Sequence, residues 1–373
     1  MYQSKARSCR PQRLAVPSLC HRPLRHSSAA YALAISLGAD YIEPDVMISS
    51  DGVAVVMHSF DISETTDVAS RSEFASRRWT FQHDGLDFAG WFTFNFTASE
   101  LRSLRLRQRY SFRSSLYNDL FSVLTLDDAI AIAQSTRRPD GEAAGLYIES
   151  KVPQVFHRFG LPIERIIMET LSARGLQGDT GANATVPVVL QSFDPASLAR
   201  FRGLTSWPLV QLLLQPSAQP TLGALLMTTP LADVAEKVHA VAPDLRGLFA
   251  KGSVEALAWV QRAHDLKLAV HVWTMRPEPQ FSFSSRAAAS DNGTEIVAAQ
   301  LRLLQHAEVD AVFIENPQDA ANLWIEPGQT QQSADVVAVT AWVLALVCFV
   351  AFFSFLKMRR DSKGFRRLED SKI

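Results

Sequence analysis

Short apolar runs alternate with helical segments along most of the chain, and this alternation restricts the fold more than any other feature. Residues 145–150, 186–190, 209–214, 268–272 and 311–314 are predicted to be strands, and residues 125–134, 162–173, 195–201, 253–265 and 296–306 are predicted to be helices. Strands separated by helices indicate a parallel sheet. With a weak first strand within residues 14–20 and another strand at 41–47, the count comes close to eight units. We therefore expect an α/β fold closed into a (β/α)₈ barrel rather than an open sheet.

The segment Gly38–His58 carries the chain's most informative charge pattern. Glu43 and Asp45 are two positions apart in an apolar strand, so their side chains should project from the same face. Turn residues 49–52 lead into a second strand, 53–57, which ends at His58. Two acids on one buried face are costly without a cation, and oxygen ligands favour a hard ion, Mg²⁺ or Ca²⁺. The alternative interpretation is a hairpin with two solvated acids and an unrelated histidine.

Charge and cysteine content exclude two classes of protein. A formal net charge of −1 over 373 residues gives no basis for nucleic-acid binding. Of the three cysteines, Cys348 lies in an apolar run, which leaves Cys9 and Cys20. Neither a disulfide framework nor a CxxC metal site can be built from these.

The C-terminal region predicts a membrane anchor. Residues 336–356 contain no charge over 21 positions, which at 1.5 Å per residue is about 31 Å, close to the ~30 Å hydrocarbon core of a bilayer. We expect a linker at 326–335, one transmembrane helix at 336–356 and a basic cytoplasmic tail at 357–373. Basic residues flanking a span favour the cytoplasmic side, so the preceding domain is expected to be lumenal or extracellular.

Glycosylation sequons agree with that orientation. Three of the chain's six asparagines, Asn95, Asn183 and Asn292, are followed by x-Thr. This proportion exceeds chance and favours a glycoprotein of the secretory pathway.

The acidic strand and its histidine resemble the core motif of the glycerophosphodiester phosphodiesterase family (GP-PDE domain), an E-x-D followed about a dozen residues later by His. The similarity extends from about Ala29 to Asn322. The resemblance implies a TIM-type barrel over residues 21–325. The loop-rich, aromatic stretch at about 67–124 is similar to the family's small inserted subdomain after the second strand, and a structural excursion with buried aromatic residues is the alternative.

The same resemblance assigns roles to individual residues. Glu149-Ser150-Lys151 is similar to the family's E-x-K strand end, and the segment around Trp273 is similar to its penultimate strand, where an aromatic side chain shapes the glycerol pocket. The implied metal ligands are Glu43, Asp45 and Glu149, the implied catalytic residues are His21 and His58, and the implied substrate-binding residues are Arg22, Lys151 and Trp273.

The first catalytic position has two interpretations. His21-Arg22 is similar to the family's opening His-Arg-Gly, although Pro23 replaces the glycine and the loop that follows is short. An alternative alignment places His26-Ser27 on a later Asn/His-Thr pair and leaves Val16 at the position of the catalytic histidine. Either the loop is truncated, or the irregular basic residues 1–20 reflect an altered start.

The expected function is metal-dependent hydrolysis of glycerophosphodiesters to glycerol 3-phosphate and an alcohol, a step of phospholipid catabolism. The alternatives are a phospholipase D-like action on lysophospholipids and a catalytically inactive, membrane-tethered binding module. The expected partners are the diester or lysophospholipid substrate and the membrane, with no nucleic acid.

Overall fold

The structure is a computed structural model that describes residues 12–15, 24–83, 85–177, 186–218, 224–283, 290 and 292–318. The chain divides into two compact units, residues 1–323 and 324–373, and every described residue belongs to the first. His21, Arg22 and the predicted helix at 336–356 lie outside the described residues and remain predictions. Among the described residues, no helix combines the length and the apolar character needed to cross a membrane.

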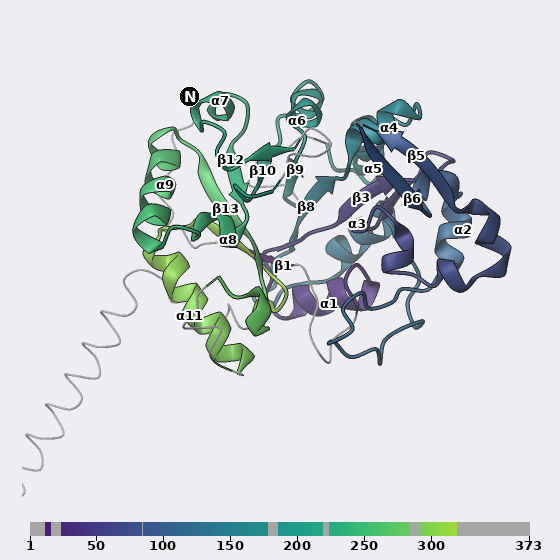
Figure 1. Ribbon diagram of the computed structural model, residues 1–373, viewed down its shortest axis with the longest axis horizontal. Helices are drawn as coiled ribbons and strands as arrows, with labels where there is room; N and C mark the ends of the chain where they lie inside the picture. The colour runs from purple at the N-terminus through teal and green to yellow at the C-terminus, as the bar shows by residue number, and fades with distance from the viewer. Residues whose placement is uncertain are drawn as a thin grey trace, which may run out of the picture. The chain divides into compact units, whose positions relative to one another are not determined.

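Eight parallel strands form a closed ring, so the predicted barrel is confirmed (Figure 1). Each strand pairs in parallel with the next in the ring, and the last pairs with the first. In ring order the strands are β1 (Gln12–Ala15), β2 (Tyr41–Ile42), β8 (Gly145–Ser150), β9 (Val188–Ser192), β10 (Leu209–Leu214), β12 (Ala240–Pro243), β13 (Ala269–Met275) and β14 (Ala311–Ile314). The two-residue strand β11 (Leu225–Leu226) pairs with β10 outside the ring.

Helices surround the strands, as the alternating sequence predicts (Figure 1). The described helices are α1 (Ser28–Ser36), α2 (Ala98–Ser103), α3 (Leu126–Ser135), α4 (Pro153–Arg158), α5 (Ile163–Ala173), α6 (Pro195–Arg202), α7 (Ala232–Ala235), α8 (Leu245–Leu248), α9 (Ser253–Asp265) and α11 (Gly293–His306). Local capping explains where α3 begins. The Thr125 hydroxyl accepts from the Asp128 amide, and the Asp128 carboxylate accepts from the Thr125 amide in return.

Side chains from alternate positions fill the barrel interior. The buried cluster contains Tyr147, Val189, Val210, Leu212, Ala240, Ala242, Ala311 and Phe313. Members two apart on one strand, such as Val210 and Leu212, share a face because side chains alternate along a strand. The interior is therefore packed, and the chemistry belongs at the ends of the strands.

Two strand predictions needed correction. The first strand lies at Gln12–Ala15 rather than within 14–20. The acidic strand divides into β2 and β3 (Asp45–Ile48) around Glu43-Pro44, since proline has no amide hydrogen to donate to a ladder. β3 then pairs antiparallel with β4 (Ala54–Val56), as the predicted hairpin requires.

The stretch between β4 and α3 forms a small substructure rich in aromatic residues, which we call the insert. It contains the hairpin of β5 (Trp79–His83) and β6 (Leu86–Gly90), the helix α2 and the 3₁₀ turns η1 (Ile62–Glu64), η2 (Val68–Ser70), η3 (Ser72–Arg77) and η4 (Thr93–Asn95). Phe92 and Phe94 stack with ring centroids 5.3 Å apart, and Phe94 stacks on Phe159 at 4.5 Å. Phe159 follows α4, so the second stack packs the insert against the barrel, and β7 (Leu124–Thr125) returns the chain to β4.

Candidate active site

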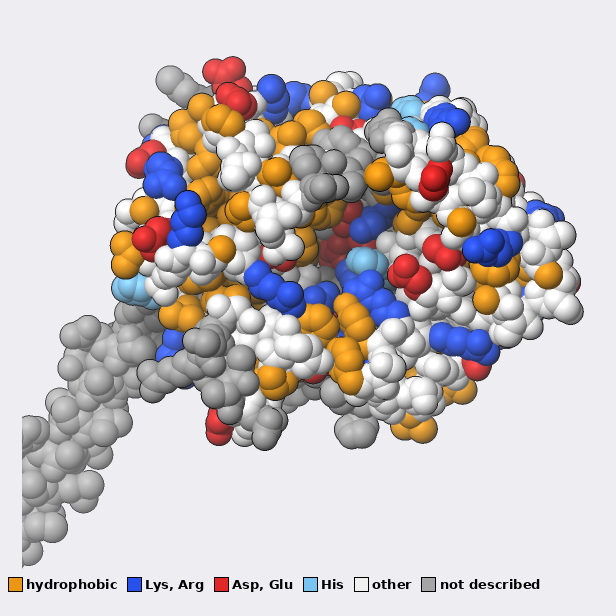
Figure 2. Space-filling model, viewed as in Figure 1, with side chains coloured by type: hydrophobic (Ala, Val, Ile, Leu, Met, Phe, Trp, Pro, Cys, Tyr) orange, Lys and Arg blue, Asp and Glu red, His pale blue; other side chains and the backbone are white. Residues whose placement is uncertain are grey.

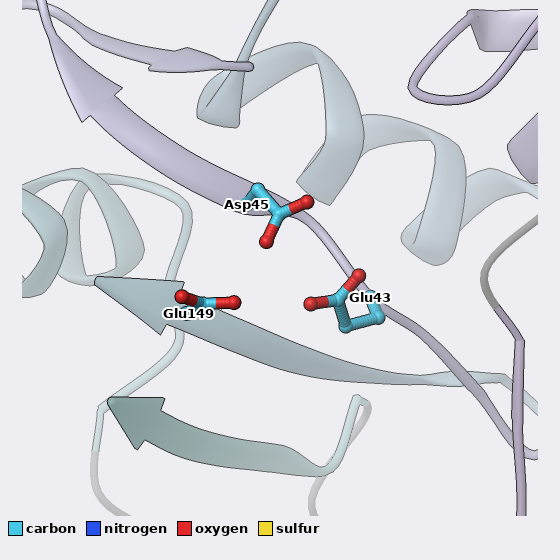
Figure 3. Close-up of side chains that lie close together, drawn as sticks. All are labelled: Glu43, Asp45 and Glu149. Atoms are coloured by element: carbon cyan, nitrogen blue, oxygen red, sulfur yellow. The ribbon is translucent and has the colours of Figure 1, made fainter. Parts of the chain in front are cut away.

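Three buried carboxylates converge at the carboxyl ends of the barrel strands. Glu43 follows β2, Asp45 begins β3, and Glu149 is the penultimate residue of β8. Asp45 lies opposite Glu149 in the parallel pairing of β3 and β8, which sets both side chains at the same height. Figure 3 shows the three side chains pointing toward one another, and one oxygen from each lies within 4.8 Å of the others. The predicted convergence of these residues is therefore observed.

The donor set fits a hard divalent ion. Glu43, Asp45 and Glu149 are nearly inaccessible to solvent, with exposed fractions of 3%, 0% and 6%. Oε2 of Glu43 and Oδ1 of Asp45 are buried without a hydrogen-bond partner. Arg25 and Lys151 form ion pairs with these two oxygens at 3.7 and 3.5 Å but no hydrogen bonds, so both oxygens keep acceptor sites for a bound metal ion. All three residues offer oxygen, the ligand type that Mg²⁺ and Ca²⁺ prefer.

Two cationic side chains also contact this carboxylate cluster. Lys151 Nζ lies 3.2 Å from Glu149 and 3.5 Å from Asp45. The Arg25 guanidinium lies 3.1 Å from Asp45 and 3.7 Å from Glu43. Lys151 was predicted to face phosphate, and its ammonium group does lie at the cluster. Arg25 was not predicted, because it belongs to the irregular loop before α1.

The three carboxyl groups have divergent proton affinities. Burial and the nearby charge of Asp45 raise the pKa of Glu43 well above its usual range. Burial also raises the pKa of Glu149, to about 8, although Lys151 opposes this shift. Burial alone would raise the pKa of Asp45, but Lys151, Arg25 and His26 hold it well below its usual range. Asp45 is therefore the carboxylate that most strongly keeps its charge at this site.

His58 lies just beyond β4 and lines two adjoining cavities. One, of about 120 Å³, also contains the carboxylate cluster, Lys151 and Trp273. The other is lined by the barrel loop at residues 24–26 and by insert residues 106–110 and Arg113. Burial, together with the charges of Arg25 and Lys151, holds the pKa of His58 well below its usual range. Figure 2 shows the hollow in this face, with Lys and Arg side chains gathered around acidic and histidine side chains.

A second histidine, His26, contacts the cluster directly. Its Nε2 lies 2.7 Å from Asp45 Oδ2 and its Nδ1 lies 2.6 Å from the Tyr31 hydroxyl. Burial lowers the pKa of His26 to about 4, although Asp45 opposes this. The Tyr31 hydroxyl in turn donates to the Glu43 carbonyl at 3.1 Å, so His26 is linked to both acidic positions. His26 entered the sequence analysis only through the alternative alignment, whose second member, Ser27, caps α1.

Trp273 and Phe193 form the apolar wall of the same cavity. The Trp273 ring lies edge-to-face with Phe193, at 5.6 Å between centroids, and its indole N–H donates to the Ala242 carbonyl at 2.7 Å. This hydrogen bond fixes the ring at the end of β13. The predicted location of Trp273 beside the carboxylate cluster is therefore observed. Gln191, one position before the end of β9, donates from its amide to Glu43 Oε1 at 2.9 Å.

Comparison with known proteins agrees with this geometry. The sequence profile described as "Glycerophosphoryl diester phosphodiesterase family" matches residues 18–319. Glycerophosphodiester phosphodiesterase GDPD6 of Arabidopsis thaliana is 33% identical over 270 residues, which covers 68% of this chain and 72% of the relative. The glycerophosphodiester phosphodiesterase of Haemophilus influenzae is 28% identical over 188 residues, or 48% of each chain.

A solved structure supports the fold. An Oleispira antarctica phosphodiesterase, crystallised in complex with the product sn-glycerol-3-phosphate, superposes with a TM-score of 0.52. It is 19% identical, and the match covers 84% of this chain and 96% of that one. Because the profile spans most of the barrel and the GDPD6 match covers two thirds of both chains, the chain belongs to the glycerophosphoryl diester phosphodiesterase family.

Proposed function

We propose that the protein hydrolyses glycerophosphodiesters to glycerol 3-phosphate and an alcohol, and that it requires a divalent metal ion. The observation that carries this proposal is the buried cluster of Glu43, Asp45 and Glu149, with ligand oxygens within 4.8 Å of one another. Such a cluster has no structural use that apolar residues would not serve better.

The residues of the site have three roles: metal binding, phosphate binding, and proton transfer or hydrogen bonding at the reacting oxygens. Glu43, Asp45 and Glu149 would hold the metal, which supplies Lewis-acid polarisation and neutralises phosphate charge when bound. Lys151 and Arg25 bind the phosphate oxygens and stabilise the charge that develops on them. His58 takes part in proton transfer or hydrogen bonding at the reacting oxygens.

The apolar wall selects what lies beside the phosphate. Trp273 and Phe193 present ring surface to the cavity that contains the carboxylates. A glycerol unit has hydrocarbon on one side and hydroxyls on the other, so it fits between this wall and the charged cluster. The sequence analysis assigns Trp273 the same role through the family resemblance.

The proposed reaction is tested by measuring turnover of several glycerophosphodiesters at controlled concentrations of divalent metal. The full chain is stripped with EDTA and assayed on glycerophosphocholine, glycerophosphoethanolamine and glycerophosphoinositol, with glycerol 3-phosphate measured enzymatically. We expect no turnover after stripping and recovery with Mg²⁺ or Ca²⁺. Full activity in EDTA would remove the metal from the mechanism, and no glycerol 3-phosphate under any condition would remove the proposed reaction.

Exposed apolar side chains on the insert favour a second candidate, headgroup release from lysophospholipids. Phe112, Leu116 and Leu120 are 49%, 68% and 63% exposed, a few residues beyond the segment that lines the cavity at His58. A single acyl chain could lie against them while the phosphate occupies the charged site. Release of choline from lysophosphatidylcholine at a rate comparable to that from glycerophosphocholine would support this activity.

A further inference from the structure

One side chain of the insert contacts the histidine assigned to catalysis. Nη1 of Arg109 lies 3.2 Å from Nδ1 of His58, although the two residues are 51 positions apart in sequence. A guanidinium group carries only hydrogen-bond donors. Nδ1 of His58 must therefore accept in this contact and cannot itself carry a proton. A neutral imidazole has one N–H group, so its proton lies on Nε2.

A protonated His58 is incompatible with the same contact. It would set an N–H group against the N–H groups of Arg109, with two like charges 3.2 Å apart. Arg25 and Lys151 add positive charge, whereas the carboxylate of Asp45 opposes them. Burial also disfavours the charged imidazolium, so the pKa of His58 is held well below its usual range.

Arg109 is not held there by an ion pair of its own. Within the described part of the chain it forms no ion pair, and its other hydrogen bond is to the hydroxyl of Tyr110, over whose ring the guanidinium lies at 4.5 Å. The neighbouring arginines are neutralised: Arg107 pairs with Asp119 at 2.7 Å, and Arg113 pairs with Glu278 and Glu315. Burial lowers the pKa of Arg109, although its contact with Tyr110 opposes this shift.

The segment that carries Arg109 is anchored to the barrel four residues later. Arg113 is 2% exposed at its side chain and lies 2.6 Å from each of Glu278 and Glu315. Glu315 directly follows β14, so these two ion pairs attach the insert to the end of a barrel strand. The position of Arg109 relative to His58 is thereby fixed by the fold.

We propose that Arg109 is a positioning residue that holds His58 in the tautomer with its proton on Nε2. The catalytic part of this inference rests on the proposed function, whereas the tautomer does not. No described residue hydrogen-bonds to Nε2 of His58. This N–H group can therefore donate to an oxygen of the substrate in the cavity that His58 shares with the carboxylates. A neutral histidine that donates in this way is an electrophile.

Nitrogen NMR tests the tautomer without any assay. Full-length protein labelled with ¹⁵N at histidine is compared with the His58→Gln variant, which identifies the His58 signals. We expect a protonated Nε2 and an unprotonated Nδ1 in the wild type, and a shift toward the Nδ1–H tautomer in Arg109→Met. A wild-type proton on Nδ1, or a pattern that Arg109→Met leaves unchanged, would overturn the inference.

Kinetics test the consequence. Arg109→Met is expected to lower kcat by about 10- to 100-fold, the usual cost of losing a group that orients a catalytic one, with KM nearly unchanged. Arg109→Lys keeps a donor and should recover part of the loss. The control is Arg105→Ala, which removes an exposed arginine of the same segment whose partner is Ser122. It should leave both constants unchanged.

Each contrary result overturns either the positioning role of Arg109, the tautomer of His58 or the proposed function. Wild-type kcat in Arg109→Met, or a loss confined to KM, would overturn the positioning role. An inactive wild-type enzyme would refute the proposed function, and the NMR comparison would still decide the tautomer. Thermal melts of the Arg109 variants show whether they are folded, and Arg109→Lys provides the second variant if Arg109→Met is not.

Discussion

At the scale of single residues, the carboxyl groups of the site differ widely in pKa. Asp45 accepts from His26 and lies near Arg25 and Lys151, so its pKa falls. Glu43 is buried beside it, and its pKa rises. Removing a titratable side chain here therefore changes the protonation of its neighbours as well.

We predict that His58→Ala lowers kcat on glycerophosphocholine by about 10²–10³-fold, the usual cost of removing a hydrogen-bond donor that stabilises developing charge. The reason is its place in the cavity that contains the carboxylates. Steady-state kinetics measure the effect, with His306→Ala as the control because that histidine is exposed on α11. If His58→Ala keeps more than about a tenth of wild-type kcat, His58 has no part in the chemistry.

The carboxylates were predictable because they lie at or near the ends of apolar strands, which meet at one edge of a barrel, and the role of Lys151 came from the family resemblance. Arg25, His26 and Arg109 were not. They lie on irregular segments, where neither a hydrophobic period nor a helix cap predicts the position of a side chain. Arg109 meets His58 only because Arg113 anchors the insert, a contact across 202 positions to Glu315 that no local pattern indicates.

At the scale of elements, buried ion pairs attach the insert to the barrel end, beside the ring contacts of Tyr110 and Phe112 with Phe281. Glu315 lies 2.6 Å from Arg113 and 2.8 Å from Arg276, and its side chain is 2% exposed. Arg276 lies three positions after Trp273. No local sequence pattern indicates that it shares the Glu315 carboxylate with Arg113 of the insert. Removing one partner of such a network leaves a buried charge.

Arg113→Ala is therefore expected to lower the free energy of unfolding by about 3–5 kcal/mol. Arg102→Ala provides the matched control. Arg102 also joins the insert to the barrel, through Asp128 of α3, but the pair is on the surface and its loss should cost less than about 1 kcal/mol. Urea unfolding measures both. Equal effects of the two substitutions would mean that the Arg113 pairs do not anchor the insert.

At the scale of the whole molecule, the barrel was predictable from periodicity, with one strand missing from the count. β12 reads Ala-Val-Ala-Pro, which is short and ends in proline, and it carries no strand signal strong enough to predict. The closed ring requires it all the same, because β10 and β13 each pair with it. Closure of the ring depends on the whole barrel, so the local sequence of β12 does not predict it.

The membrane anchor and its orientation remain proposals at this scale. If residues 336–356 span a membrane with the basic tail in the cytosol, the barrel is lumenal and its sequons are open to glycosylation. Full-length chain made in a eukaryotic cell should then shift in mobility on endoglycosidase treatment. Asn183→Gln is expected to remove most of the shift. Asn95→Gln should have little effect, because Asn95 is half-buried and the Thr97 hydroxyl is engaged in the α2 capping box. No shift, with protease sensitivity from the cytosolic side, would reverse the orientation.

The measurement closest to the central claim is calorimetric titration of Mg²⁺ and of Ca²⁺ into the metal-stripped wild type and into Asp45→Asn. Asp45 is fully buried, and Asn keeps its shape while removing its charge. The account predicts saturable binding of at least one of these ions to the wild type, and loss of both binding and turnover in Asp45→Asn, with an unchanged circular dichroism spectrum. Equal affinity in the two proteins would contradict the assignment of Glu43, Asp45 and Glu149 as the metal site.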